Sequence, residues 1–249
     1  MFFRTANPAL SDKAFDQVSG STQDGQMTIS GTVNKTFILL ALVVSAAIYT
    51  WTQAASKGLG SIAPWMIFGA IGGLVIAIVT VFKKEWVSKT APIYAVCQGL
   101  FLGGISSMFE AQYPGLVIQA VGMTFGTLFC LLGVYKSGLI KVTDNLRMGI
   151  AAAMGGLMLV YLVTFVLGLF GVNMSILTGS GPFSILISLV AVTIASLNLV
   201  LDFDFIEKGA AQGAPKYMEW YGAFGLMVTL IWLYIEILRL LSKLRDRRN

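Results

Sequence analysis

Asp202 and Asp204 are the residues of this chain whose position most suggests chemistry, because both acids close a long apolar run that covers residues 183–201. An ionised carboxylate beside hydrocarbon costs several kcal/mol, about 3 kcal/mol on insertion scales. Acids kept in such a place commonly hold or move ions or protons. These two aspartates are therefore the first candidates for a functional site.

The two aspartates lie on different faces of one predicted helix, because positions four apart share a helix face and positions two apart do not. Asn198 and Asp202 therefore lie on one stripe, with Asn198 as a hydrogen-bonding neighbour of an inward-facing Asp202. Asp204 turns away toward Lys208, and we expect it at a cytoplasmic rim. Two interpretations of Asp202 stay open: a structural cap or ion pair at the membrane boundary, and a role in ion or proton passage.

The last apolar segment carries a second polar stripe, whose members recur at spacings of three and seven: Glu219, Gly222, Thr229, Glu236 and Arg239. Arg239 follows Glu236 by three residues and can neutralise it, and Lys216 precedes Glu219 by three. The stripe predicts a buried helix face that supports the aspartates.

Glu110 ends the third apolar segment, and we expect it at the outer surface. One interpretation is an ordinary solvated acid. The other is a vestibule that attracts cations.

Composition defines the class of protein that must position these groups. Of the 249 residues, 56% are hydrophobic and 12% are charged, whereas soluble domains have about 25% charged residues. This is the composition of a polytopic membrane protein. The net charge of +5 is explained by loop bias and lipid contact, so we expect no nucleic-acid partner.

Histidine is absent from the chain, which removes the commonest metal ligand, general base and near-neutral pH switch. The two cysteines, Cys97 and Cys130, fall inside apolar segments, and we expect buried thiols. We therefore expect no enzyme activity, no resident metal and no cofactor.

Seven apolar segments, each near the ~20 residues that cross a bilayer, predict an all-α seven-transmembrane-helix bundle with the last helix central. We expect a polar flexible tail over residues 1–34, the membrane domain over 35–243 and a basic tail over 244–249. Small residues spaced four apart predict close helix packing. The segments lie at about 36–55, 62–82, 91–110, 114–135, 147–170, 183–204 and 217–241, and the small-residue pairs are Gly69/Gly73, Gly99/Gly103, Ala151/Gly155 and Ala152/Gly156.

The lysines and arginines gather in the N-terminal tail and the even-numbered loops, which predicts a cytoplasmic N-terminus. The basic residues after the last segment break this pattern. We favour seven full spans, with the last helix enclosed by the others so that it can keep charges that lipid would not accept.

Three stretches of sequence resemble the transmembrane Bax inhibitor motif (Bax inhibitor-1) family, and its bacterial branch in particular. They are the third-span text YAVCQGLFLG at 94–103, the run LDFDFIE at 201–207 and the ending IEILR at 235–239. The resemblance covers residues 35–241. It implies a seven-helix fold with a central last helix, and a bacterial inner-membrane location.

The resemblance also implies a pH-sensitive calcium leak that is gated by one aspartate on each of the last two helices. The sixth-helix aspartate corresponds to Asp202, whereas the seventh-helix position holds Thr229. Many relatives have Glu where this chain has Gln98, and a second-helix arginine has no counterpart in residues 62–82. A second gating carboxylate would therefore be Glu219 or Asp204.

Two functions follow as hypotheses. The first is a cation leak, with Ca²⁺ as a transient permeant ion, because paired carboxylates can hold either a shared proton or a hard cation. The alternative is a regulatory protein that binds another membrane protein or a membrane protease. The expected partners are thus the lipid bilayer, calcium or other cations, and such a protein.

Overall fold

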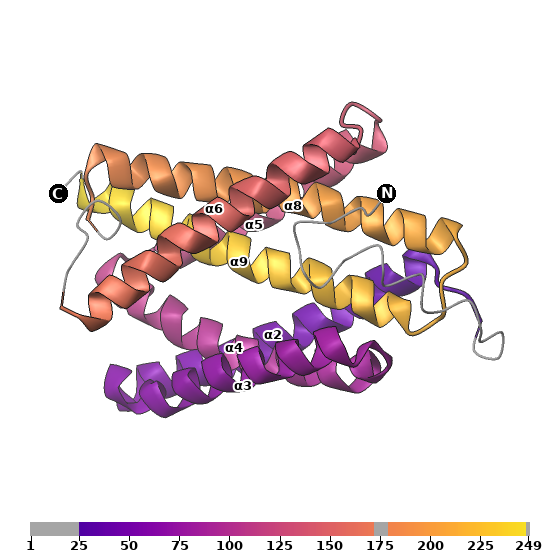
Figure 1. Ribbon diagram of the computed structural model, residues 1–249. Coiled ribbons are helices and arrows are strands. Elements are labelled where there is room, and N and C mark those ends of the chain that lie inside the picture. Colours follow the sequence, from indigo (N-terminus) through magenta and orange to yellow (C-terminus); the bar gives the residue numbers. More distant parts are fainter. Residues whose placement is uncertain (1–24, 172–178, 248–249) are drawn as a thin grey trace. The chain divides into compact units, whose positions relative to one another are not determined.

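The computed structural model describes residues 25–171 and 179–247, and the described chain is almost entirely helical (Figure 1). Seven of its helices are long and apolar enough to cross a membrane. They are α2 (Ile29–Lys57), α3 (Ala63–Phe82), α4 (Val87–Gln112), α5 (Leu116–Lys136), α6 (Asp144–Leu169), α8 (Pro182–Ala211) and α9 (Met218–Asp246), with short 3₁₀ turns at Leu59–Ile62 and Lys84–Trp86. The seven expected spans are confirmed, and the chain is a multi-pass membrane protein.

Several helices are longer than the apolar segments that predict them. The first begins at Ile29, because the side chain of Thr28 accepts a hydrogen bond from the Gly31 N–H and caps its N-terminus. The sixth span, α8, continues to Ala211 and the last, α9, to Asp246. Residues 25–34 of the expected polar tail therefore have defined structure, and residues 1–24 lie outside the described part of the chain.

Over its described residues the chain divides into two compact units: one ends at Pro114 and also holds Asp202–Val228, and the other holds Gly115–Leu201 and the part of α9 from Thr229 onward. Helices α8 and α9 each contribute one part to both units. The last helix is the most buried of the seven spans, as expected of a helix enclosed by others.

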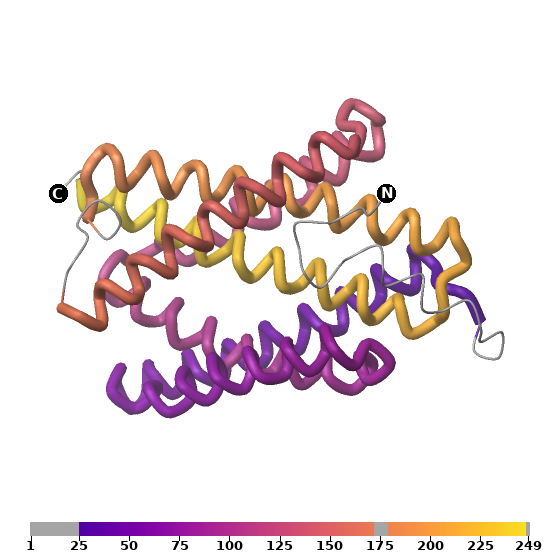
Figure 2. Tube along the Cα trace, viewed as in Figure 1, coloured from indigo at the N-terminus to yellow at the C-terminus, as the bar shows by residue number. Residues whose placement is uncertain are grey.

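In the first of these units, α4 packs against both α2 and α3, and the tube in Figure 2 shows these helices side by side. A Cβ at Gly103 would meet the Ala47 Cα of α2 at 2.7 Å, and one at Gly69 would meet the backbone nitrogen of Phe101 in α4 at 2.8 Å. The small residues of α3 and α4 thus let backbones approach closely, as predicted.

In the other unit, α6, α8 and α9 share an apolar cluster of Leu157, Ala191 and Ile194, with Trp232 packed against it. The expected packing role of Gly155 and Gly156 is wrong, because no described atom lies within 4 Å of a Cβ built at either glycine. The expected burial of Cys130 is also wrong: it is an exposed free thiol on α5, whereas Cys97 on α4 is buried.

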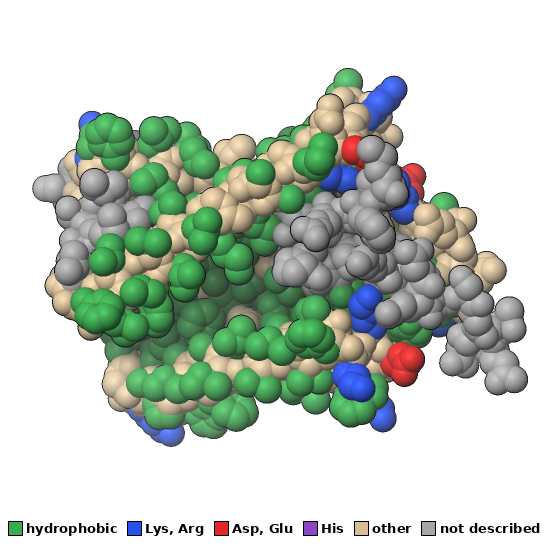
Figure 3. Space-filling view, in the orientation of Figure 1, with side chains coloured by type: hydrophobic (Ala, Val, Ile, Leu, Met, Phe, Trp, Pro, Cys, Tyr) green, Lys and Arg blue, Asp and Glu red, His purple; other side chains and the backbone are tan. Residues whose placement is uncertain are grey.

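Gly155, Gly156 and Cys130 lie on helices whose surface is largely exposed. Hydrophobic side chains cover the helices on the face drawn in Figure 3, and charged side chains gather near the helix ends. Helices α5 and α6 are the least buried of the spans. Lipid is as apolar as a protein core, so small or sulfur-containing residues are tolerated on such exposed helices.

We predict that Gly103→Ala lowers the thermal stability of the detergent-solubilised protein, because the added methyl group meets rigid α2 backbone rather than a flexible side chain. Overpacking of this kind costs about 1–3 kcal/mol, which corresponds to a Tm lower by several degrees. The measurement is a thermal unfolding scan. Gly133→Ala, at a position with open space around it, is the matched control and should be neutral or slightly stabilising. Equal Tm values for the two variants would contradict the prediction.

Candidate functional site

Asp202 lies inside α8, about two and a half turns before the helix ends at Ala211. Its relative exposure is 0%, which confirms the predicted inward orientation. Asn198, one turn earlier on the same helix, is buried as well. The helix thus presents an acid and an amide on one buried stripe.

Asn198 and Thr229 each bury a polar oxygen without a hydrogen bond. Within the described chain, neither Asn198 Oδ1 nor Thr229 Oγ1 has a hydrogen-bond partner. Buried polar atoms are usually satisfied, so each such oxygen calls for a water or an ion. Both belong to the same compact unit.

The spacing of residues along α8 and α9 brings Asn198 and Thr229 to similar heights. Near one end of the two helices, the Lys243 ammonium donates to the Ser184 carbonyl at 3.3 Å and to Ser188 Oγ at 2.8 Å. The same number of residues, nearly four helical turns, separates Ser184 from Asn198 in α8 and Thr229 from Lys243 in α9.

Asp204 pairs with Lys208 one turn later, with 2.9 Å between Nζ and Oδ2, as the sequence predicts. The Asp204 side chain is more buried than a rim position suggests, whereas that of Lys208 is 45% exposed. The Lys208 ammonium thus lies nearer to the outside than the Asp204 carboxylate does.

Glu219 is a fully buried acid at the start of α9. It forms an ion pair with Lys216 at 2.9 Å, as predicted, and a second one with Lys35 of α2. Thr28 donates to Glu219 Oε1 from its N–H at 2.9 Å and from its hydroxyl at 2.8 Å. The helix N-terminus adds a favourable dipole. Glu219 is therefore an ion with a full set of partners.

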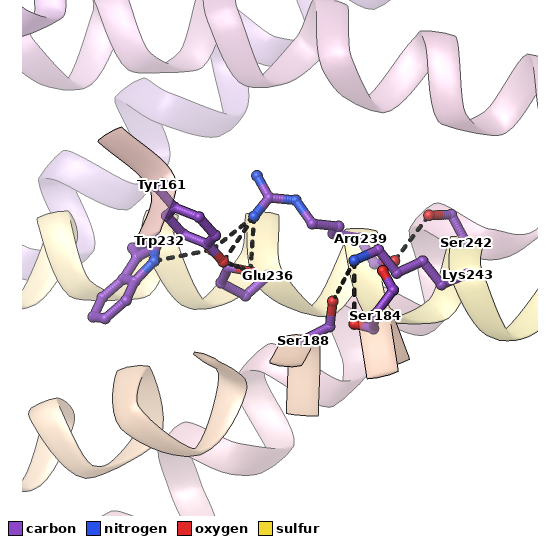
Figure 4. A network of polar contacts seen from close by, with 8 residues as sticks. All are labelled: Tyr161, Ser184, Ser188, Trp232, Glu236, Arg239, Ser242 and Lys243. Atoms are coloured by element: carbon purple, nitrogen blue, oxygen red, sulfur yellow. Dashed lines mark hydrogen bonds and ion pairs between the residues drawn. The ribbon is translucent and has the colours of Figure 1, made fainter. Parts of the chain in front are cut away.

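Glu236 is the centre of a polar network that joins α6 to α9 (Figure 4). Its carboxylate accepts hydrogen bonds from the Tyr161 hydroxyl at 3.0 and 3.1 Å, from Trp232 Nε1 at 3.2 Å and from Arg239 Nη1 at 3.1 Å. The predicted pairing of Glu236 with Arg239 is confirmed.

Arg239 covers this buried acid. The guanidinium also donates to the Tyr161 hydroxyl at 2.9 Å and lies 5.1 Å from the centre of the Tyr161 ring. Its side chain is 38% exposed, whereas that of Glu236 is 2% exposed. The arginine thus stands between the carboxylate and the outside.

The sequence did not predict four partners of the buried acids Glu219 and Glu236: Thr28, Lys35, Tyr161 and Trp232. Two features of the sequence could have indicated the last two: Tyr161 places a hydroxyl in the apolar sequence of α6, and Trp232 places an indole one turn before Glu236. Nothing in the sequence links Thr28 or Lys35 to an acid more than 180 residues away.

Glu110 is half-buried in the last turn of α4, and its vestibule role stays a prediction. Among the residues that the structure describes, no group of three or more Cys, Asp or Glu side chains is placed to hold a metal ion.

The fold and its buried polar groups define a class: a multi-pass helical membrane protein whose last two spans carry acids inside the protein. A family model described as "Bax inhibitor 1 like" matches residues 7–246, which is nearly the whole chain. The protein belongs to this family. Neither the comparison with curated proteins nor the one with solved structures gives a match.

We predict that Arg239→Gln destabilises the protein by about 2–4 kcal/mol, because it leaves a buried carboxylate without its cation. The double variant Glu236→Gln/Arg239→Gln should recover much of that loss, since it removes both charges. Thermal unfolding in detergent measures both effects as a double-mutant cycle. Additive losses from the two single changes would show that the pair is not coupled.

Proposed function

We propose that this protein is a pH-sensitive cation leak channel, with calcium as a permeant ion and Asp202 as the gating carboxylate. The complete burial of Asp202 within a membrane-spanning helix is the observation that carries the proposal. Intramembrane acids mark ion or proton pathways more often than they serve stability, because their burial is costly. Carboxylates also supply selectivity for cations over anions.

Two buried neutral oxygens of α8 and α9 support the same function. Asn198 Oδ1 and Thr229 Oγ1 are buried without hydrogen-bond partners in the described chain. Amide and hydroxyl oxygens are hard ligands, and Ca²⁺ binds oxygen ligands, including water. We infer that water or a passing cation contacts these two groups.

Three other buried acids form ion pairs: Asp204 with Lys208, Glu219 with Lys35 and Lys216, and Glu236 with Arg239. Asp202 is the central group of the proposal because it corresponds to the sixth-helix aspartate of the family and is completely buried, with Asp204 and Glu219 as secondary gate residues.

A proton and a cation compete for the same carboxylate. When Asp202 is protonated, its attraction for a cation is lost, so the leak should close as the pH falls. When it is ionised, its charge favours entry of a cation, so the flux should rise as the pH rises. The protein then senses pH without a histidine.

We predict that calcium flux into proteoliposomes containing the full chain rises between pH 5 and pH 8. Asp202→Asn should lower the flux at pH 8 about tenfold and remove its pH dependence, because an amide keeps the shape and loses the titrating charge. A fluorescent calcium indicator inside the vesicles measures the rate. Asp144→Asn removes an exposed acid at the start of α6, outside the proposed gate, and is the matched control that should keep the pH dependence.

A flux in Asp202→Asn that matches wild type at every pH would contradict the leak mechanism. Vesicles with wild-type protein that leak no faster than empty ones would favour the alternative, a regulatory protein that binds another membrane protein. In that case, deletion of residues 1–24 or of the basic C-terminal tail should abolish the cellular phenotype.

We further propose that the protein resides in a bacterial inner membrane with its N-terminus in the cytoplasm and that it is not an enzyme. The basic residues of the even-numbered loops support this orientation. Single cysteines introduced into those loops should react with a membrane-impermeant maleimide only after the cells are opened.

A further inference from the structure

Residues 25–28 run along the connection between α8 and α9. The Met27 N–H donates to the Ala214 carbonyl at 2.7 Å, and the Lys216 N–H donates to the Gly25 carbonyl at 3.1 Å. Gln26 and Pro215 form an isolated antiparallel bridge between them. The side chain of Met27 is buried. This short segment therefore binds the connection through its backbone.

The buried carboxylate of Glu219 also binds this segment. Its carboxylate accepts both hydrogen bonds from Thr28, and Thr28 is also the residue that caps α2. Its ion pair with Lys35 reaches about two turns further into α2. The Lys35 ammonium also lies 5.6 Å from the centre of the Trp220 ring. One carboxylate thus joins the beginning of α2 to the beginning of α9.

Two glycines show how tightly these elements meet. A Cβ at Gly31 would collide with the Glu219 carboxylate. A Cβ at Gly222 would lie 3.0 Å from Ile206 of α8, 3.2 Å from Thr32 of α2 and 3.5 Å from Met27. The first turns of α2 and α9, the last turns of α8 and the 25–28 segment therefore pack around one point.

The last turns of α8 connect this point to Asp202. Residues 202–211 are continuous helix that leads into the clasped connection. A helix moves as a stiff element, so a connection held at 214–216 restricts the displacement of the acid. Freeing the connection would let the segment that carries Asp202 move.

We propose that Glu219 is a positioning residue: together with residues 25–35 it forms a clasp that holds the α8–α9 connection on α2 and restrains the leak through Asp202. The inference rests on the proposed function, and it specifies how Glu219 acts as a secondary gate residue: through fixed contacts, without itself binding the proton or the cation. The clasp uses fixed ion pairs and hydrogen bonds, and its opening permits faster flux.

A cysteine pair tests whether the clasp opens. Gln26→Cys/Pro215→Cys in a Cys97→Ala/Cys130→Ala background should form a disulfide rapidly under mild oxidation, because the two residues are bridge partners. Adding Glu219→Gln should slow disulfide formation about tenfold. Lys208→Met, which removes an ion pair within α8 only, should leave the rate unchanged.

Flux through proteoliposomes tests whether the clasp restrains the leak. The oxidised cysteine pair should leak calcium at least fivefold more slowly than the reduced pair, and reductant should restore the rate. Glu219→Gln should leak faster than wild type. Gly31→Ala provides a second variant that keeps every charge and opens the clasp by collision, with Gly133→Ala as its matched control.

Two results would overturn the proposal: disulfide formation that Glu219→Gln and Gly31→Ala both leave unchanged, or Asp202-dependent flux that is equal in the oxidised and reduced pair. A wild-type protein without Asp202-dependent flux would overturn the proposed function and with it the restraint on the leak. The rate of disulfide formation does not depend on flux, so it still decides whether Glu219 holds the clasp.

Discussion

An ionised side chain inside a membrane protein must find its partners within the protein, because hydrocarbon supplies no water to solvate it. Much of the polar structure of this chain follows from that constraint. Glu219 is surrounded by two ammonium groups and a threonine, and Glu236 by a guanidinium, a phenol and an indole. Lys243 reaches two buried serines of α8. Each arrangement ties α9 to another helix, so the polar contacts also fix the position of the last span.

The two ends of α9 are held by different chemistry. At its start, Glu219 joins α9 to the cap of α2. Toward its end, Glu236 and Arg239 join α9 to Tyr161 of α6. Thr229 lies between these anchors and carries a buried hydroxyl that lacks a hydrogen bond among the described residues. In our proposal, the anchored ends keep α9 in place while its polar middle contacts water or a passing cation.

Membership of the Bax inhibitor 1 like family fits the seven-span fold and the acid on α8. This chain nevertheless has Thr229 where the resemblance implies a second gating aspartate. A hydroxyl can bind a cation or water but does not titrate near neutral pH. In our proposal the pH response therefore depends on Asp202, and Thr229 and Asn198 contribute neutral oxygens.

The sequence by itself determined the seven spans, since each needs only a run of apolar residues long enough to cross a bilayer. It also determined the ion pairs Asp204–Lys208 and Glu236–Arg239, because residues three or four apart meet on any helix. The pair Lys216–Glu219 joins the turn before α9 to its first helical turn, and three-residue spacing predicted it as well. Only the tertiary structure decided that Lys35 and Thr28 reach Glu219 and that Tyr161 reaches Glu236. It likewise decided that α3 and α4 use their glycines for close packing while α6 does not. Helical periodicity fixes which residues share a face, but the neighbour of that face depends on how distant helices pack, and no local pattern contains that information.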